Sequence, residues 1–321
     1  MSSTRDFAID VEKGVFLLLI VIGHLWNIPD SVKFLLMPTD LIYVPIFFFL
    51  SGLLFKKDKY SFREFVSRKA KTLLLPYFSF FILFCICDWN LYLNTESFLL
   101  NAISSLVYGN GPSKALPLWF VSTLFFSSIL LYVAASAKTR MLKCVIIGIY
   151  FSSFIFCDFY HVHLPFSIHR AAGGALIMYS GWLIKNTHLL NFEKNLLFHI
   201  TCFVVMCVGI YMHIGLLNEY TNHSLLGFPS SICGCIFITA VSKRWFSKKH
   251  IVESFFTWLA ENGIIVLSVH FYIICCISNV LKLYGIGTWI SFFVQLFSVF
   301  LSIYLIIPLL KKIKPAFWGF K

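Results

Sequence analysis

Apolar runs of bilayer length recur along the whole chain, and they constrain its fold more than any other feature. Hydrophobic residues fill 59% of the 321 positions and charged residues only 12%. A soluble domain of this size could not bury so much apolar surface. The sequence therefore predicts an all-α, polytopic integral membrane bundle of about ten transmembrane helices. The expected spans lie near 14–29, 34–55, 72–93, 117–136, 143–159, 170–185, 196–215, 225–241, 262–282 and 286–308.

The basic residues predict how these helices are oriented. With ten spans, both termini lie on one side of the membrane. Only four of the 26 Lys and Arg residues then fall in loops of the other side, namely Lys33, Lys114, Arg170 and Lys282, and the remaining 22 lie on the side of the termini. Since basic residues are retained in cytoplasmic loops, the N- and C-termini are expected to be cytoplasmic. This orientation also accounts for the net charge of +12 without a nucleic acid partner.

No loop is long enough to fold separately. We therefore expect residues 1–321 to form a single transmembrane domain, with spans over about 14–308, no separate soluble domain and no cleavable signal peptide. The ten cysteines contain no CxxC pair, which favours buried, inert thiols over disulfides or metal ligands. His161, His163 and His169 cluster in an outer loop without suitable acidic or thiol neighbours, so no metal site is expected there.

An ionisable residue, His24, lies deep in the first apolar run. Residues 13–24 read KGVFLLLIVIGH. Eleven helical steps of about 100° place Lys13 and His24 within about 20° of one helical face, about 16 Å apart along the axis. An ionisable group at this depth is costly and usually faces a bundle interior or a watery cavity. We interpret His24 as functional, the alternative being a packed histidine bonded to a neighbouring carbonyl.

Further basic residues gather where the third run leaves the cytoplasm. In RKAKTLLLPY, residues 68–77, Arg68 and Lys71 are three positions apart and share a helical face. Pro76 lies about one turn inside, where a kink would open backbone carbonyls to a cavity. Together with Lys13, these residues offer three cations around one inner mouth, which favours phosphate groups. Topology and attraction to anionic lipids are the alternative explanation of the same charges.

Several segments together resemble the acyltransferase type 3 family of polytopic membrane O-acyltransferases, especially its fucose 4-O-acetylase-like branch. They occur in the family's order and are Asp10 with KGVFLLLIVIGH, PIFFFLSGLLF at 45–55, RKAKTLLLPY at 68–77, PLWFVSTLFF at 117–126 and ENGIIVLSVH at 261–270. Many relatives also carry a histidine just before the second segment. This chain reads Tyr43-Val44-Pro45 there, so no role of that histidine is carried over.

The family pattern implies a basic residue ahead of the first-span histidine and a basic pair at the third span. Lys13 and His24 meet the first requirement, with lysine in place of the commoner arginine. Arg68 and Lys71 meet the second, although the second residue of the pair is usually arginine. The resemblance thus implies that Lys13, Arg68 and Lys71 bind the phosphates of acetyl-CoA. It implies that His24 acts as a general base or carries the acetyl group itself.

The implied reaction moves an acetyl group from cytoplasmic acetyl-CoA to a sugar hydroxyl of a surface polysaccharide or its lipid-linked precursor. Acetyl-CoA is then a co-substrate, and no tightly bound cofactor is expected. The implied partners are the glycan acceptor and membrane lipids, and the implied location is the inner or plasma membrane of a bacterium. Many relatives carry an additional extracytoplasmic hydrolase-like domain, and this chain is expected to act alone or with a separate partner.

Three further residues are assigned to the acceptor side. Arg170 breaks the positive-inside pattern, and the small residues behind it favour an inward side chain over one that snorkels to lipid. Trp119, in the fourth matching segment, is grouped with it. His270 should lie about 12 Å into the ninth run, close to the depth of His24. We therefore predict a tunnel from the inner mouth past His24 to Arg170, with His270 on its wall, the alternative being a His270 bonded to a helix carbonyl away from any cavity.

The competing function is transport, by a flippase or a proton-coupled carrier of a glycan precursor. His24 and His270 would then relay protons, and the basic mouth would hold an anionic headgroup. The sequence shows neither an inverted repeat nor broken helices in matching halves. An acyltransferase should bind or slowly hydrolyse acetyl-CoA, whereas a carrier should ignore it.

Overall fold

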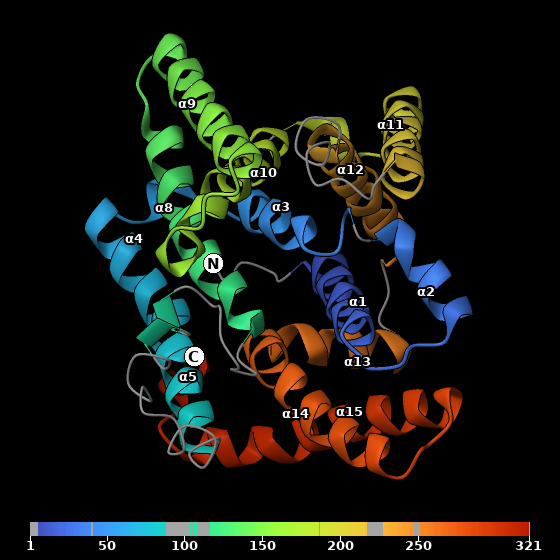
Figure 1. The fold of residues 1–321 in the computed structure, drawn as a ribbon. Coiled ribbons are helices and arrows are strands. Elements are labelled where there is room, and N and C mark those ends of the chain that lie inside the picture. The colour runs from blue at the N-terminus through green and yellow to red at the C-terminus, as the bar shows by residue number, and fades with distance from the viewer. Residues whose placement is uncertain are drawn as a thin grey trace.

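The computed structural model describes residues 6–39, 41–87, 103–104, 106–107, 116–185, 187–216, 227–246 and 251–320. Over these residues the fold is all-helical, without a strand (Figure 1). The α-helices are α1 Phe7–Gly23, α2 Asp30–Leu36, α3 Pro45–Leu53, α4 Phe62–Lys69, α5 Leu75–Cys87, α8 Trp119–Ser136, α9 Arg140–Phe159, α10 Ala171–Ile184, α11 Leu196–Leu216, α12 Phe228–Trp245, α13 Ile251–Glu261, α14 Gly263–Leu283 and α15 Thr288–Lys312. The short turns are η1 Met37–Thr39, η2 Lys57–Lys59, η3 Ala70–Leu74, η4 Leu116–Leu118, η5 Pro165–Arg170, η6 His188–Leu190 and η9 Pro315–Trp318.

Among the described residues, 5 helices are long and apolar enough to cross a membrane. They are Phe62–Cys87, which joins α4, η3 and α5, and the single helices α8, α9, α14 and α15. These helices correspond to the third, fourth, fifth, ninth and tenth apolar runs of the sequence. The protein is therefore a multi-pass membrane protein. Helices α1, α3, α10, α11 and α12 coincide with the other runs but are shorter or less apolar over the residues described, so the number of ten spans stays a prediction.

Two of the predicted spans differ from the observed helices. The first was expected to reach residue 29, but α1 ends at Gly23. The second, over 34–55, is divided into α2, η1 and α3. Pro38 and Pro45 explain this division, because a proline has no backbone N–H to continue a helix and is tolerated only in its first turn.

Helix α4, which precedes the third predicted span, is continuous with it. A π-helical turn, η3, joins α4 to α5. It lies just before Pro76, whose missing N–H leaves a carbonyl one turn earlier without an α-helical partner. At the other end, α4 begins with a capping box in which Ser61 and Glu64 each bond the other's backbone N–H.

Helix α1 lies in the middle of the bundle, where it contacts α12, α13 and α14 (Figure 1). Gly14 allows α1 to approach α13, since a Cβ at this position would overlap the backbone oxygen of Phe256. Gly52 of α3 meets the backbone of Met178 in α10 in the same way. Lipid provides no hydrophobic driving force between helices, so such small residues stabilise the bundle by permitting close packing. By contrast, none of the residues of α9 is buried, and this helix lies at the edge of the bundle.

Candidate active site

Helix α1 carries both residues singled out in the first apolar run. It begins at Asp6, whose side chain accepts a hydrogen bond from the backbone N–H of Ile9 (3.4 Å). It then continues without interruption to Gly23, and His24 is its C-cap residue. Lys13 and His24 therefore lie toward opposite ends of one rigid element.

His24 and His270 lie side by side. Their ring centroids are 5.1 Å apart, with an interplanar angle of 71°. His270 is fully buried in α14, and the ring of Phe271 also packs edge-on against His24, at 5.6 Å. Two histidines from helices far apart in the sequence are thus brought into contact.

Each histidine is bonded to the carbonyl four residues earlier in its own helix. Nδ1 of His24 lies 2.7 Å from the oxygen of Ile20, and Nδ1 of His270 lies 2.8 Å from the oxygen of Val266. A carbonyl oxygen only accepts hydrogen bonds, so in the neutral rings Nδ1 carries the proton and Nε2 keeps a lone pair. Nε2 of His270 is buried and has no hydrogen-bond partner among the described residues. The pair therefore offers ring nitrogens that can accept protons.

A cavity of about 1020 Å³ lies at the other end of α1. This volume is at the upper end of the range for small-molecule pockets. Its walls come from the start of α1, the start of α14, the region between α3 and α4, and the C-terminal segment. The charged lining residues are Lys13, Lys56, Lys59 and Lys69 on one hand, and Asp6, Asp10 and Glu261 on the other. Helices α1 and α14 thus both begin at this cavity, and each carries one histidine of the pair further along.

The wall formed by the residues before α4 is electropositive. Lys59 and Arg68 lie over the ring of Tyr60, at 5.1 Å and 4.2 Å from its centroid. The pKa of the Tyr60 phenol lies below its ordinary value, because Lys59 hydrogen-bonds to it and the charge of Arg68 is close. Asp6, which also lines the cavity, is paired with Lys243 at 3.4 Å. An anionic ligand group fits best on the side of Tyr60.

The structure separates the three cations predicted for the inner mouth. Lys13 lines the cavity, and Arg68 contacts it through the tyrosine just described. Lys71 is exposed and does not belong to the lining. Lys69, which the sequence did not single out, lines it instead. Lys69 follows Phe65 by four positions on the face that meets the cavity, whereas Lys71, two positions later and about 200° further around the helix, points away from it.

Glu12 is a buried carboxyl group that sequence reasoning did not identify. Its Oε1 accepts a hydrogen bond from the hydroxyl of Thr239 in α12 (2.8 Å), and its Oε2 has no hydrogen-bond partner among the described residues. Successive helical residues point about 100° apart, so Glu12 faces α12 while Lys13 faces the cavity. This contact therefore helps to fix the rotation of α1 about its axis. The only sign of Glu12 in the sequence is an acidic residue beside an apolar run. Its partner, Thr239, is 227 positions away, so local sequence could not reveal the contact.

Arg170 and Trp119, both assigned to the acceptor side, are in contact. The guanidinium carbon lies 4.3 Å from the centre of the indole ring. Phe166 and Ser167, just before Arg170, have φ angles of 54° and 55°, a strained conformation for residues other than glycine. The turn η4, which immediately precedes Trp119, contacts α14. The pair therefore lies near the helix that carries His270.

Among the described residues, the cysteines and the other histidines considered in the sequence form no second site. None of the ten cysteines forms a disulfide. The rings of His163 and His169 lie 5.4 Å apart, yet among the described residues no three His, Cys, Asp or Glu side chains are placed to hold a metal ion. Lys114, one of the four cations expected on the outer side, lies outside the described residues. The lining of the cavity ends at Lys13 on α1 and Ile265 on α14, before the two histidines.

A comparison with family models gives the class of protein. The model described as an acyltransferase domain, Acyl_transf_3, matches residues 6–311, from the cap of α1 to the last turn of α15. No curated protein and no solved structure matches the chain. The matched region includes the histidine pair, Arg170 and most of the cavity lining. The chain therefore belongs to the acyltransferase 3 family and is a membrane acyltransferase.

Proposed function

We propose that this protein moves an acetyl group from acetyl-CoA to a sugar hydroxyl, the activity implied by its resemblance to fucose 4-O-acetylases. The acceptor would be a surface polysaccharide or its lipid-linked precursor, at the inner or plasma membrane of a bacterium. The observation that supports this proposal most is the contact between His24 and His270, on two helices that both begin at a basic cavity. The same two helices thus connect a site for a charged donor with a pair of groups suited to hydroxyl chemistry.

In the proposed reaction, Nε2 of His24 takes the proton of the acceptor hydroxyl while the hydroxyl oxygen attacks the carbonyl carbon of the thioester. The carbon–sulfur bond then breaks, and the imidazolium returns the proton to the leaving sulfur. The products are an acetyl ester and CoA with a free thiol. The bond from Nδ1 to Ile20 holds the ring in the tautomer that this step requires. If the acetyl group is first carried by the histidine, the same Nε2 forms the acyl bond.

His270 has a positioning role in this proposal. Its Nε2 is a buried acceptor next to the reacting group, and Nδ1 is already bonded to Val266. It can therefore accept a hydrogen bond from the acceptor sugar and orient it toward His24. Its ring edge also limits the orientations of the His24 ring.

The cavity would bind the donor. Acetyl-CoA carries several phosphate groups, and the four lysines of the cavity supply positive charges that suit them. The carboxylates Asp10 and Glu261 can accept hydrogen bonds from the amide groups of the pantetheine arm. The arm would then follow α1 from Lys13 toward His24 over about 16 Å. On the far side, Arg170 and Trp119 would contact the acceptor.

We also infer that the chain forms one domain that crosses the membrane about ten times, with both termini in the cytoplasm. Five long apolar helices and the positions of α1, α3, α10, α11 and α12 support this count. The cavity would then open on the side where acetyl-CoA is available. No tightly bound cofactor is required by the proposed chemistry.

The proposal can be tested with purified protein in detergent and acetyl-CoA labelled in the acetyl group. Wild-type protein should bind the donor and slowly release CoA, whereas His24→Ala should bind it without release. His188→Ala, on the short turn η6, is the matched control and should behave as wild type. In cells, the O-acetyl content of the surface polysaccharide should follow the same order. A wild-type protein that neither binds nor cleaves acetyl-CoA would favour transport instead.

A further inference from the structure

A buried glutamine of α15 is bonded to the chain just after His24. Gln295 is fully buried, although many of the other residues of α15 are exposed and apolar. Its Oε1 accepts a hydrogen bond from the backbone N–H of Trp26 (2.9 Å), and its Nε2 donates to the backbone oxygen of Trp26 (2.8 Å). Nε2 also lies 3.1 Å from the oxygen and 3.0 Å from the hydroxyl of Ser291. One side chain thus binds both polar groups of a single peptide residue.

This contact is needed because α1 ends early. The apolar sequence continues past His24, but the helix stops, and the N–H and carbonyl of Trp26 no longer have helical partners. Leu25 and Ile28 are buried, so this segment lies largely within the bundle rather than in water. A buried backbone group without a partner is costly, especially in a membrane protein. An uncharged amide can serve as donor and acceptor at once, and this explains a glutamine at position 295.

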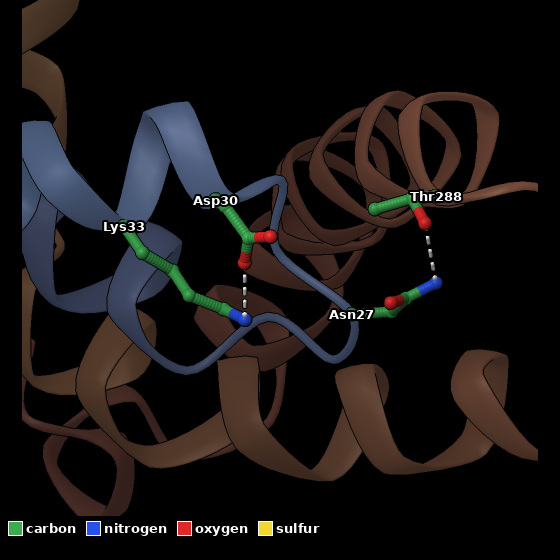
Figure 2. Close-up of polar contacts among 4 residues, drawn as sticks. All are labelled: Asn27, Asp30, Lys33 and Thr288. Carbon is green, nitrogen blue, oxygen red and sulfur yellow. Dashed lines mark hydrogen bonds and ion pairs between the residues drawn. The ribbon is translucent and has the colours of Figure 1, made fainter.

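The hairpin of α14 and α15 holds the same segment by two further contacts. Asn27 has a φ angle of 59°, and its side chain donates to the hydroxyl of Thr288 at the start of α15 (3.3 Å; Figure 2). The ammonium of Lys282, near the end of α14, lies 4.6 Å from the centre of the Trp26 indole ring. Helix α14 also carries His270. The segment after His24 is therefore attached to the same hairpin as the second histidine.

We propose that Gln295 is a positioning residue for His24. His24 is at a helix end, where its backbone is held on one side by the bonds of α1 and on the other by the peptide that Gln295 binds. Fixing Trp26 two positions later keeps the His24 ring 5.1 Å from that of His270. The inference rests on the proposed function, because it assigns to Gln295 an effect on the reaction that His24 performs. A displacement of about 1 Å at a reacting group can lower a rate about 100-fold.

Gln295→Leu tests this role, because leucine removes the two hydrogen bonds to Trp26 while keeping a side chain of similar size. We expect kcat for acetyl transfer to fall about 100-fold, with the KM for acetyl-CoA within about twofold of wild type. Ser298→Ala, one turn further along α15, is the matched control and should leave both constants unchanged. A purely structural role would lower the yield of folded protein and would not separate kcat from KM. A folded Gln295→Leu protein with wild-type kcat would overturn the proposal.

Gln295→Glu provides a second test that does not depend on the leucine variant. The carboxylate can still accept from the N–H of Trp26 but cannot donate to its carbonyl. We expect a reduced kcat, about tenfold below wild type, again with an unchanged KM for acetyl-CoA. A folded glutamate variant with wild-type kcat would contradict the inference. If wild-type protein itself shows no transfer from acetyl-CoA, the proposed function fails. This outcome does not depend on the variants.

Discussion

The two ends of α1 differ in how their polar groups are held. Around Lys13, four lysines and three carboxylates share a cavity of about 1020 Å³. At His24, Nδ1 of the ring and the peptide that follows each have a single partner, the carbonyl of Ile20 for the ring and Gln295 for Trp26. At the cavity end several charged groups can therefore replace one another, whereas at the histidine end each of these groups depends on a single contact. This difference predicts that substitutions at the histidine end will act mainly on kcat and those at the cavity end mainly on donor affinity.

The largest effect is expected for His24→Asn. Asparagine resembles the ring in size and can still donate a hydrogen bond, but its amide cannot take a proton from a hydroxyl. Acetyl transfer should fall by about 10²–10⁴-fold, the usual contribution of a general base. Affinity for CoA, measured by calorimetry on the same preparation, should stay unchanged. Transfer near the wild-type rate would show that the chemistry occurs elsewhere and would remove the proposed contrast between the two ends.

His270→Leu should have the next largest effect. Leucine fills part of the buried site but has no nitrogen to orient the acceptor or to face the His24 ring edge. We expect kcat to fall about 100-fold, less than the largest decrease predicted for His24, since the proposed general base remains. Phe271→Leu, which changes the neighbouring ring beside His24, is the control and should lower kcat by a smaller factor. If His270→Leu were as active as wild type, the contact between the histidines would be only packing.

Donor binding should respond more weakly, because the cavity lysines can substitute for one another. A hydrogen bond to a charged group contributes about 1.5–3 kcal/mol, and screening in an open cavity reduces this to about 0.5–1 kcal/mol. Lys13→Ala and Lys69→Ala should therefore each weaken CoA binding by about two- to fivefold, and more at low salt than at high salt. Lys71→Ala, on the same continuous helix as Lys69 but exposed, is the control. A larger effect for Lys71 than for Lys69 would reverse this assignment.

This pair of lysines illustrates what sequence reasoning could not determine. Arg68 and Lys71 share a helical face, but the face that meets the cavity is that of Phe65 and Lys69, and the π turn η3 alters the register beyond it. A π turn depends on the packing around it and on Pro76, and periodicity alone does not reveal it. The early end of α1 is a similar case, because Gln295, which binds the peptide beyond it, is 269 positions away in the sequence.

The similar level of His24 and His270 along their helices, by contrast, could be predicted. The distance of His24 and His270 from the start of each apolar run depends only on local sequence and helical rise, and the two rings do lie in contact. The long spans α8, α9, α14 and α15 were predicted for the same reason, since a continuous apolar run determines them. Properties set by one helix could thus be read from the sequence. Contacts between helices, such as that of Glu12 with Thr239, could not.

An effect as small as that of the cavity lysines is expected on the acceptor side, which lies outside the comparison of the two ends. Arg170 lies against Trp119 at 4.3 Å, and an exposed contact of this kind contributes about 0.5–1 kcal/mol. Arg170→Ala should therefore raise the KM for the glycan acceptor by about two- to fivefold, with no change in CoA affinity. Arg170→Lys should be affected nearly as much, because an ammonium lacks the planar face that stacks on the indole ring. The control is Lys33→Ala, which removes an exposed cation expected on the same side and paired with Asp30 (Figure 2). An Arg170→Ala enzyme with an unchanged KM for the acceptor would mean that the arginine binds lipid headgroups, and the acceptor would then have to enter elsewhere.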